Sequence, residues 1–162
     1  MNRDDIQKLS EYLRPLGKEE FATHLEKVRE LYSLIIKNEF QETNEDACLI
    51  MLRCIEEFED DFEVVTFSCK SLRFLTRNEE NTSRLIKANA CQVLLKTFKR
   101  FELDFAFIEV WMLPLWNILI FPDESNRRIF VDLGGCEICV AMLERYPDVP
   151  SVAEAFIIGK II

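Results

Sequence analysis

The chain has 162 residues and a mass of 19.1 kDa, which fits one domain with a sizeable buried core. Its 49% apolar and 30% charged residues exclude an intrinsically disordered chain, and only four glycines argue against the many tight turns of a β-sandwich or barrel. The net charge of −9 argues against nucleic acid or an anionic membrane as the main partner, and a single histidine leaves general-base catalysis without its usual residue.

The first forty residues predict a helical N-terminal cap. A short amphipathic helix is expected over residues 5–13, broken at Pro15 and Gly17, and a longer helix over residues 19–38. We interpret the single His24 as a solvated side chain on the longer helix. Helical repeat proteins need atypical terminal units with a polar outer face, and residues 1–40 fit such a unit.

Residues 41–162 contain an internal repeat that is marked by cysteines. Residues 48–58, 91–101 and 136–146 each begin with Cys, and aliphatic side chains follow two and four places on. An apolar residue stands seven places on and an aromatic residue ten places on, which is typical of a helix with one buried face. Successive copies lie 43 and 45 residues apart, and a period in the forties indicates a HEAT or armadillo solenoid.

Two further helices complete the predicted unit. A short helix precedes the second and third copies, with Asn81 and Asn126 as expected N-caps, and Gly134–Gly135 supplies a sharp turn. Asp104 and Ser151 are the expected caps of the last two third helices. A short helix followed by two longer ones is the armadillo form, whereas HEAT units have two helices. A third, strongly apolar helix is expected after each copy, over residues 62–76, 105–121 and 152–162.

We therefore predict an all-α fold, a right-handed armadillo-type α-solenoid of about 2.5–3 repeats with a helical N-terminal cap. The units span about residues 41–78, 79–122 and 123–162. The last residues, 157–162, are apolar and carry no polar cap, so either another chain covers this end or the sequence belongs to a longer solenoid.

The six cysteines are interpreted as free thiols in a reducing compartment. The N-terminus shows no apolar signal core, and the richest apolar stretch, residues 110–121, is about half of the ~20 residues that span a bilayer. A cytoplasmic location without a membrane partner is expected. Cys136 and Cys139 form a C-x-x-C pair, but zinc would need two more ligands and a redox pair would follow a strand. We expect buried small hydrophobic side chains, no metal and no cofactor.

Residues 44–162 resemble armadillo repeats in general. The resemblance rests on Leu-Trp-Asn at 115–117, then Asn126, Phe130 and Gly134–Gly135. With Asp-Glu-Ser at 123–125 and an aromatic-Pro pair at 146–147, the pattern more narrowly resembles the armadillo domain of the Zyg/Zer substrate receptors of cullin-RING ubiquitin ligases.

That narrower resemblance implies a pocket on the third helices that reads glycine at protein N-termini. Trp116 and Asn117 match the Trp-Asn pair of the family's pocket. The acid that follows closely in the family is displaced here to Asp123 by residues 118–122. Lys160 stands where the family has an asparagine, and its positive charge would repel an amino terminus.

The peptide ladder of nuclear-import armadillo proteins needs an asparagine on each third helix. The corresponding residues are Phe74, Asn117 and Lys160, so only one of the three positions matches. Binding of basic localisation signals is therefore not expected, despite the acidic charge of the chain.

Third helices line the concave surface of an armadillo stack, so their exposed side chains form the candidate partner-binding groove. Trp116 is a candidate binding anchor, with core packing as the alternative, because its counterpart Arg73 in the preceding unit is polar. Pro114 removes one amide from the same helix and should kink it. The candidate groove residues are Lys70, Arg73, Phe74, Arg77, Trp116, Asn117 and Lys160.

Six acidic side chains within eight residues form a candidate acidic patch, at the turn before the third helix of the first unit (residues 62–76). One interpretation is a docking patch for a basic partner; the other is a solvated turn whose acids favour the start of the next helix through its dipole. The first 80 residues hold 19 acidic and 11 basic side chains, so an electrostatic partner would meet that half. The patch consists of Glu56, Glu57, Glu59, Asp60, Asp61 and Glu63.

These observations predict a non-enzymatic protein–protein interaction scaffold or adaptor that binds a partner peptide or helix through an armadillo groove. The alternative is a substrate-recognition module of a cullin-RING ubiquitin ligase that reads protein N-termini. The sequence carries no nucleophile elbow, phosphate loop or zinc signature that would favour an enzyme.

Overall fold

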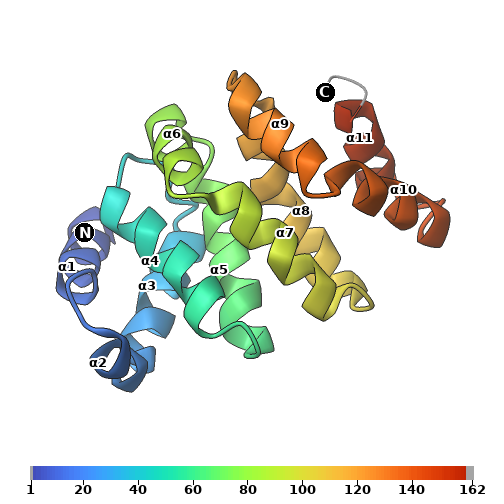
Figure 1. Ribbon diagram of the computed structural model, residues 1–162. Coiled ribbons are helices and arrows are strands. Elements are labelled where there is room, and N and C mark those ends of the chain that lie inside the picture. Colours follow the sequence, from blue (N-terminus) through green and yellow to red (C-terminus); the bar gives the residue numbers. More distant parts are fainter. Residues whose placement is uncertain (1, 160–162) are drawn as a thin grey trace.

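The computed structural model describes residues 2–159, and within this range the backbone forms eleven helices and no strand (Figure 1). The described part is therefore all-α, as predicted. The first forty residues contain α1 (Asn2–Leu13), α2 (Lys18–Thr23) and α3 (Leu25–Lys37). The remaining helices are α4 (Glu45–Glu57), α5 (Phe62–Leu75), α6 (Glu79–Lys87), α7 (Ala90–Phe101), α8 (Phe105–Ile120), α9 (Glu124–Asp132), α10 (Gly135–Arg145) and α11 (Pro150–Gly159).

The longer helices lie in rows between an N-terminal end formed by α1 and α2 and a C-terminal end formed by α10 and α11 (Figure 1). In one row α3 packs against α5, α5 against α8 and α8 against α11. In the other row α1 packs against α4 and α4 against α7. The short helix α6 contacts both α4 and α7, and α9 contacts both α7 and α10.

The row of α3, α5 and α8 begins with two parallel helices. The rings of Tyr32 on α3 and Phe67 on α5 are stacked with centroids 5.0 Å apart, and Arg29 on α3 pairs with Glu63 on α5. Arg29 comes before Tyr32 along α3, and their partners Glu63 and Phe67 follow in the same order along α5. The two helices therefore run in the same direction. Between residues 38 and 44 the chain forms no helix, so the predicted first unit, residues 41–78, holds the two helices α4 and α5 without a short helix before them.

Five helices of the described chain begin with an Asn or Asp side chain that caps the first turn. The predicted cap Asp104 is confirmed, because its carboxylate accepts from the N–H of the residue three places on. The predicted caps Asn81 and Asn126 are wrong: each lies three residues after the residue that caps the helix. Ser151 also lies inside the first turn, because α11 begins at Pro150. The observed caps with such bonds are Asn44, Asp61, Asn78, Asp104 and Asp123.

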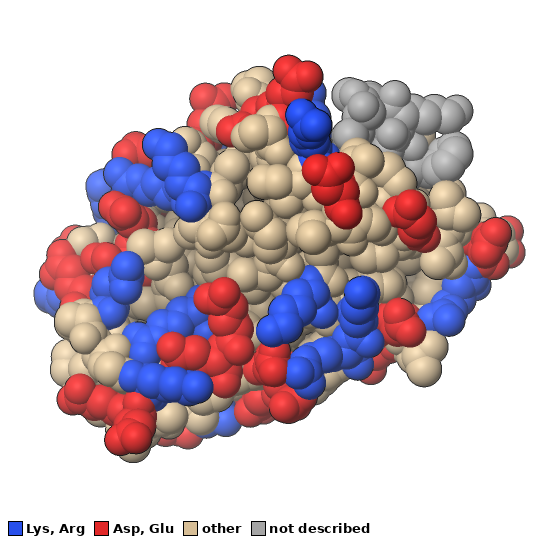
Figure 2. Space-filling view, viewed as in Figure 1, with Lys and Arg blue, Asp and Glu red and all other residues tan. Residues whose placement is uncertain are grey.

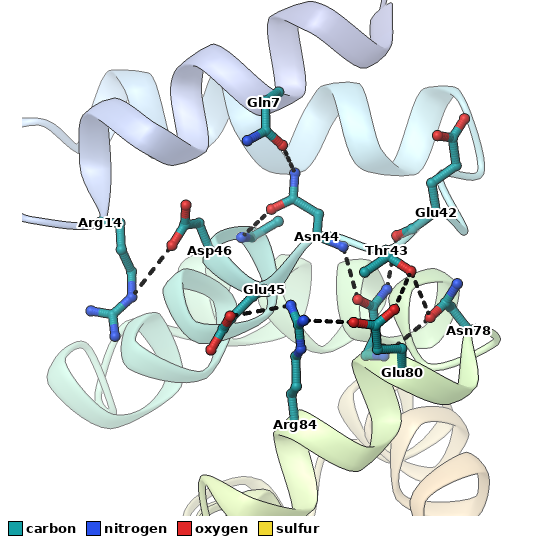
Figure 3. Close-up of polar contacts among 12 residues, drawn as sticks. Gln7, Arg14, Glu42, Thr43, Asn44, Glu45, Asp46, Asn78, Glu80 and Arg84 are labelled. Carbon is teal, nitrogen blue, oxygen red and sulfur yellow. Dashed lines mark hydrogen bonds and ion pairs between the residues drawn. The ribbon is translucent and has the colours of Figure 1, made fainter.

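A polar network holds the N-terminal helices to the first repeat (Figure 3). The Asn44 side chain caps α4 and also donates from Nδ2 to Gln7 of α1 at 3.1 Å. Arg84 of α6 pairs with Glu45 of α4 at 3.2 Å and with Glu80 on its own helix at 2.6 Å. The start of α4 is thereby tied to α1 on one side and to α6 on the other.

The predicted single helix over residues 19–38 is interrupted at His24, between α2 and α3. The carbonyl of Glu20 would accept from the His24 N–H in a continuous helix. Instead the Thr23 hydroxyl donates to that carbonyl at 2.7 Å, and the imidazole Nδ1 lies 2.7 Å from it. The His24 N–H turns to the carbonyl of Phe21 at 3.0 Å, which ends α2.

The predicted turn at Gly134–Gly135 is confirmed, and each glycine has its own cause. Gly134 has φ +80°, in the left-handed region, and Asn89 takes the equivalent place before α7 with φ +63°. Gly135 has an ordinary φ, but a Cβ there would lie 2.3 Å from the Phe130 ring. The close approach of α10 to Phe130 therefore requires glycine at this position.

Burial of the cysteines follows their place in the stack. The prediction of buried thiols holds for five residues, but Cys136 is exposed. Its counterparts Cys48 and Cys91 are fully buried, since α6 and α7 pack against α4, and α9 packs against α7. Among the described residues no helix takes the corresponding place against α10. Val140, whose counterparts in α4 and α7 are buried, is exposed for the same reason.

Candidate protein-binding surface

The predicted groove cations of α5 lie on one side of that helix. Lys70 and Arg73 are half-buried and Arg77 is exposed, just beyond the helix end. Each cation lies over an aromatic ring: Lys70 over Phe67 at 5.8 Å, and both Arg73 and Arg77 over Phe74, at 5.5 and 5.3 Å. The apolar part of these side chains therefore covers the rings, while the charges stay at the surface.

Two of the predicted groove residues are part of the core. Phe74 and Trp116 are each 6% exposed, so neither ring is available as a surface anchor. The Trp116 Nε1 donor is buried and has no acceptor among the described residues, whereas Nε1 of Trp111 donates to the carbonyl of Leu94 at 2.7 Å. Of the two interpretations of Trp116, core packing is the one that its burial matches. The α8 helix continues through Pro114.

Asn117 joins α8 to the end of α5. Its Nδ2 donates to the Thr76 hydroxyl at 2.9 Å and lies 3.3 Å from the carbonyl of Arg73. The two bonds use the donors of the amide to fix the spacing of the two helices. Asn117 is still half-exposed, so part of its side chain faces the surface beside the cations.

A cavity of about 300 Å³ opens where α5, α6 and α8 meet. Arg77 and Asn117, both predicted as groove residues, lie on its wall. Its lining combines apolar and polar side chains, and Ile120 on this wall is 58% exposed. The other lining residues are Thr76, Glu79, Thr82, Phe121 and Pro122. Sequence reasoning missed Ile120. It is the counterpart of Arg77 in the next repeat, 43 residues later, so the repeat alignment could have found it.

The structure thus brings Lys70, Arg73, Arg77 and Asn117 together on the surface shared by α5 and α8, and places Phe74 and Trp116 beneath it. Lys160 lies outside the described residues. We call Lys70, Arg73, Arg77, Asn117 and Ile120 the α5–α8 surface.

The predicted acidic patch is largely neutralised by contacts within the chain. Glu59 pairs with Arg100 at 2.5 Å and with Lys96 at 3.4 Å, and Asp60 also pairs with Arg100. Figure 2 shows the result, with basic and acidic side chains alternating along the lower edge of the molecule. These pairs span about forty residues, the length of one repeat, so they join neighbouring units.

The other acids of the patch have local roles. Asp61 caps α5, and Glu57 pairs with Arg53 at 2.7 Å. Glu63 accepts from Arg29 and from the Tyr32 hydroxyl, and these hydrogen bonds hold the pKa of the Glu63 carboxyl below its usual range. Glu56 is exposed and has no ion pair among the described residues. The arrangement matches the interpretation of a turn whose acids support the next helix better than that of a free docking patch.

The described part of the chain contains no candidate metal site, no paired thiols and no membrane-spanning helix. Residues 2–159 hold no group of three His, Cys, Asp or Glu side chains placed to bind a metal ion. Cys136 and Cys139 are both free thiols. Burial of Cys139, with a smaller electrostatic effect of Cys136, raises the pKa of the Cys139 thiol to about 11. None of the helices in this range combines the length and the apolar run needed to cross a bilayer.

Comparison with known proteins adds no relative: no protein-family model, curated protein or solved structure matches this chain.

Proposed function

We propose that this chain is a non-enzymatic protein–protein interaction scaffold that binds a partner peptide or helix through the α5–α8 surface, on an armadillo-type solenoid. The cysteine-marked repeat of 43 and 45 residues supports the solenoid, as does the serial packing of α3, α5, α8 and α11. In such a stack the third helices form a continuous surface, and repeat proteins use that surface for binding. A cytoplasmic location belongs to the same proposal and rests on the free thiols.

The observation that carries the proposal is the cavity between α5, α6 and α8. It places an exposed apolar side chain, Ile120, beside the cation of Arg77 and the amide of Asn117. A few polar groups around an apolar contact are what a peptide side chain needs for an oriented fit.

The test uses a random peptide library displayed on phage and selected against the immobilised chain. We expect enriched peptides to bind the wild-type chain and to lose at least tenfold in affinity with Ile120→Glu. Ile120 is 58% exposed, so the variant should fold normally. Leu103→Glu is the matched control, because Leu103 is 76% exposed and lies at the turn between α7 and α8. Peptides that bind both variants and the wild type equally would refute a role for this surface.

The alternative is a ubiquitin-ligase substrate receptor that reads protein N-termini. It rests on the Trp116–Asn117 pair, but Trp116 is only 6% exposed, so the ring of that pair is not open to a ligand. A peptide that begins with free glycine separates the two proposals from each other. Tighter binding of that peptide than of its acetylated form would favour the receptor, and equal binding would favour the scaffold.

We also propose that another chain covers the apolar C-terminal end. Val140 is 48% exposed and lies one helical turn after the exposed Cys136 on α10, and Val131 and Leu133 at the end of α9 are 44% and 47% exposed. Exposed aliphatic side chains that form one patch are typical of an interaction site.

A further inference from the structure

The three cations of α5 differ from most arginines of this chain in having no carboxylate partner. Within residues 2–159, neither Lys70, Arg73 nor Arg77 takes part in an ion pair. The arginines that do pair with a carboxylate are Arg3, Arg14, Arg29, Arg53, Arg84 and Arg100. In a chain of net charge −9, a stripe of unpaired cations leaves charge available for a ligand.

The helix dipole alone does not account for this stripe. It favours cations in the last turn of a helix, which covers Arg73, and Arg77 follows the end of α5. Lys70 lies more than one turn before that end, where the dipole effect has faded. Phe67 and Phe74 hold the three side chains over their rings and so limit the freedom that binding would otherwise remove.

The spacing of the cations fits an extended peptide. The guanidinium carbons of Arg73 and Arg77 lie 5.5 and 5.3 Å from the centroid of one ring, that of Phe74, so the two charges are held close together. Side chains on one face of an extended strand recur every ~6.8 Å. Carboxylates two residues apart can therefore meet Arg73 and Arg77 together, with guanidinium groups that bind carboxylates through paired hydrogen bonds.

The cavity beyond Arg77 selects a different side chain. Ile120, Phe121 and Pro122 give it an apolar wall. The wall also carries one cation, Arg77, and one carboxylate, Glu79, so it favours neither sign of charge. The residue of the ligand that enters the cavity is therefore uncharged and apolar.

We propose that the α5–α8 surface binds an acidic, extended protein segment, in which two glutamates or aspartates two residues apart contact Arg73 and Arg77 and an apolar side chain beside them enters the cavity. Lys70 extends the same contact to a further carboxylate. This inference rests on the proposed function and names its ligand class.

The experiment uses two fluorescein-labelled peptides with Gly-Ser flanks, one with the core Glu-Ala-Glu-Ala-Leu and one with Gln in place of both Glu. We expect saturable binding of the acidic peptide to the full chain by fluorescence anisotropy, and at least tenfold weaker binding of the Gln peptide. Arg73→Glu combined with Arg77→Glu should weaken binding of the acidic peptide at least tenfold. Reversing the core sequence reports the direction in which the peptide lies.

The control variant combines Lys87→Glu with Arg128→Glu. Both residues are exposed, neither has an ion pair in the described part of the chain, and the change in net charge is the same. Equal loss of binding in both double variants would mean attraction to the overall charge and would overturn the proposal. If the Arg73 and Arg77 variant does not fold, Arg73→Gln with Arg77→Gln replaces it, since it removes the charges without reversing them.

The remaining outcomes separate this inference from the proposed function. Library peptides that depend on Ile120 but carry no acids would leave the scaffold standing and refute the acidic ligand. No library enrichment and no binding of the acidic peptide would refute both. A single-stranded oligonucleotide of equal charge that displaces the peptide and binds more tightly would assign the stripe to nucleic acid instead, and would also overturn the inference.

Discussion

The side-chain carbonyl of Asn81 accepts a hydrogen bond from the backbone N–H of Asn44, 2.9 Å away and 37 residues earlier in the chain. Asn81 is fully buried, and its Nδ2 donates to the carbonyls of Glu42 at 2.9 Å and Leu75 at 3.0 Å. One amide therefore satisfies three backbone groups from the loop before α4 and the end of α5. Asn126 takes the same place in the next unit, where its Nδ2 donates to Ile118 at 3.3 Å.

We predict that Asn81→Ala lowers the free energy of unfolding by about 2–4 kcal/mol, because two buried backbone groups and one part-buried group lose their partner. Asn126→Ala should cost only about 1–2 kcal/mol, since one such bond is lost. Urea unfolding followed by circular dichroism measures both. Equal effects of the two substitutions would contradict the role given to the contact with Asn44.

The second prediction compares the two tryptophans of α8. Trp111→Phe and Trp116→Phe remove the same atoms from buried sites, but only Trp111 loses a hydrogen bond, that to the carbonyl of Leu94. Trp111→Phe should therefore destabilise the chain by about 1–1.5 kcal/mol more than Trp116→Phe. Thermal and urea unfolding of the two variants give the difference. A larger loss for Trp116→Phe would show that its Nε1 has a partner after all.

The third prediction concerns Gly135, where a Cβ would lie 2.3 Å from the ring of the fully buried Phe130. Gly135→Ala should lower the free energy of unfolding by about 2–3 kcal/mol, because the ring cannot move aside without strain. Gly17→Ala is the control, because a Cβ at Gly17 would have no heavy atom within 4 Å, and its expected cost is within about 1 kcal/mol. If the clash is the cause, Gly135→Ala costs less in a Phe130→Leu background than in the wild type.

Some of these features could be predicted from the sequence and others could not, for physical reasons. The helices over residues 62–76 and 105–121 follow from continuous apolar stripes, which a helix must bury, and their bounds agree with α5 and α8 within a residue. The caps predicted at Asn81 and Asn126 are wrong because an asparagine at the third helical position and one at the cap look alike in a sequence. Only the partner distinguishes them: a cap bonds the next turn, whereas Asn81 bonds a loop 37 residues away.

The candidate site was predictable in part. The cations of α5 and Asn117 could be found because their positions recur with the repeat. The burial of Trp116 depends on how α8 packs against its neighbours, which the helix pattern alone does not determine. The pairing of Glu59 and Asp60 with Arg100 was missed because it joins two repeats, and charge counting treats each acid as free.

The last prediction uses the single exposed thiol. Cys136 is exposed, whereas burial raises the pKa of Cys48, Cys54 and Cys69 to about 12 and that of Cys91 to about 11. Since the thiolate is the reactive form, a maleimide at pH 7.5 should label one cysteine of the native chain quickly and the other five only after unfolding, as counted by mass spectrometry. Cys136→Ser should abolish the fast label without loss of stability. Buried thiols stay protonated in the native chain at a pH where the thiols of the unfolded chain, with a pKa of 9.0, already ionise. Ionisation therefore favours the unfolded chain, and stability should fall from about pH 9 upward. If another chain covers the C-terminal end, its addition should slow the labelling of Cys136, and Val140→Glu should remove that protection. Unchanged labelling in a complex that forms through α10 would contradict the proposal for this end.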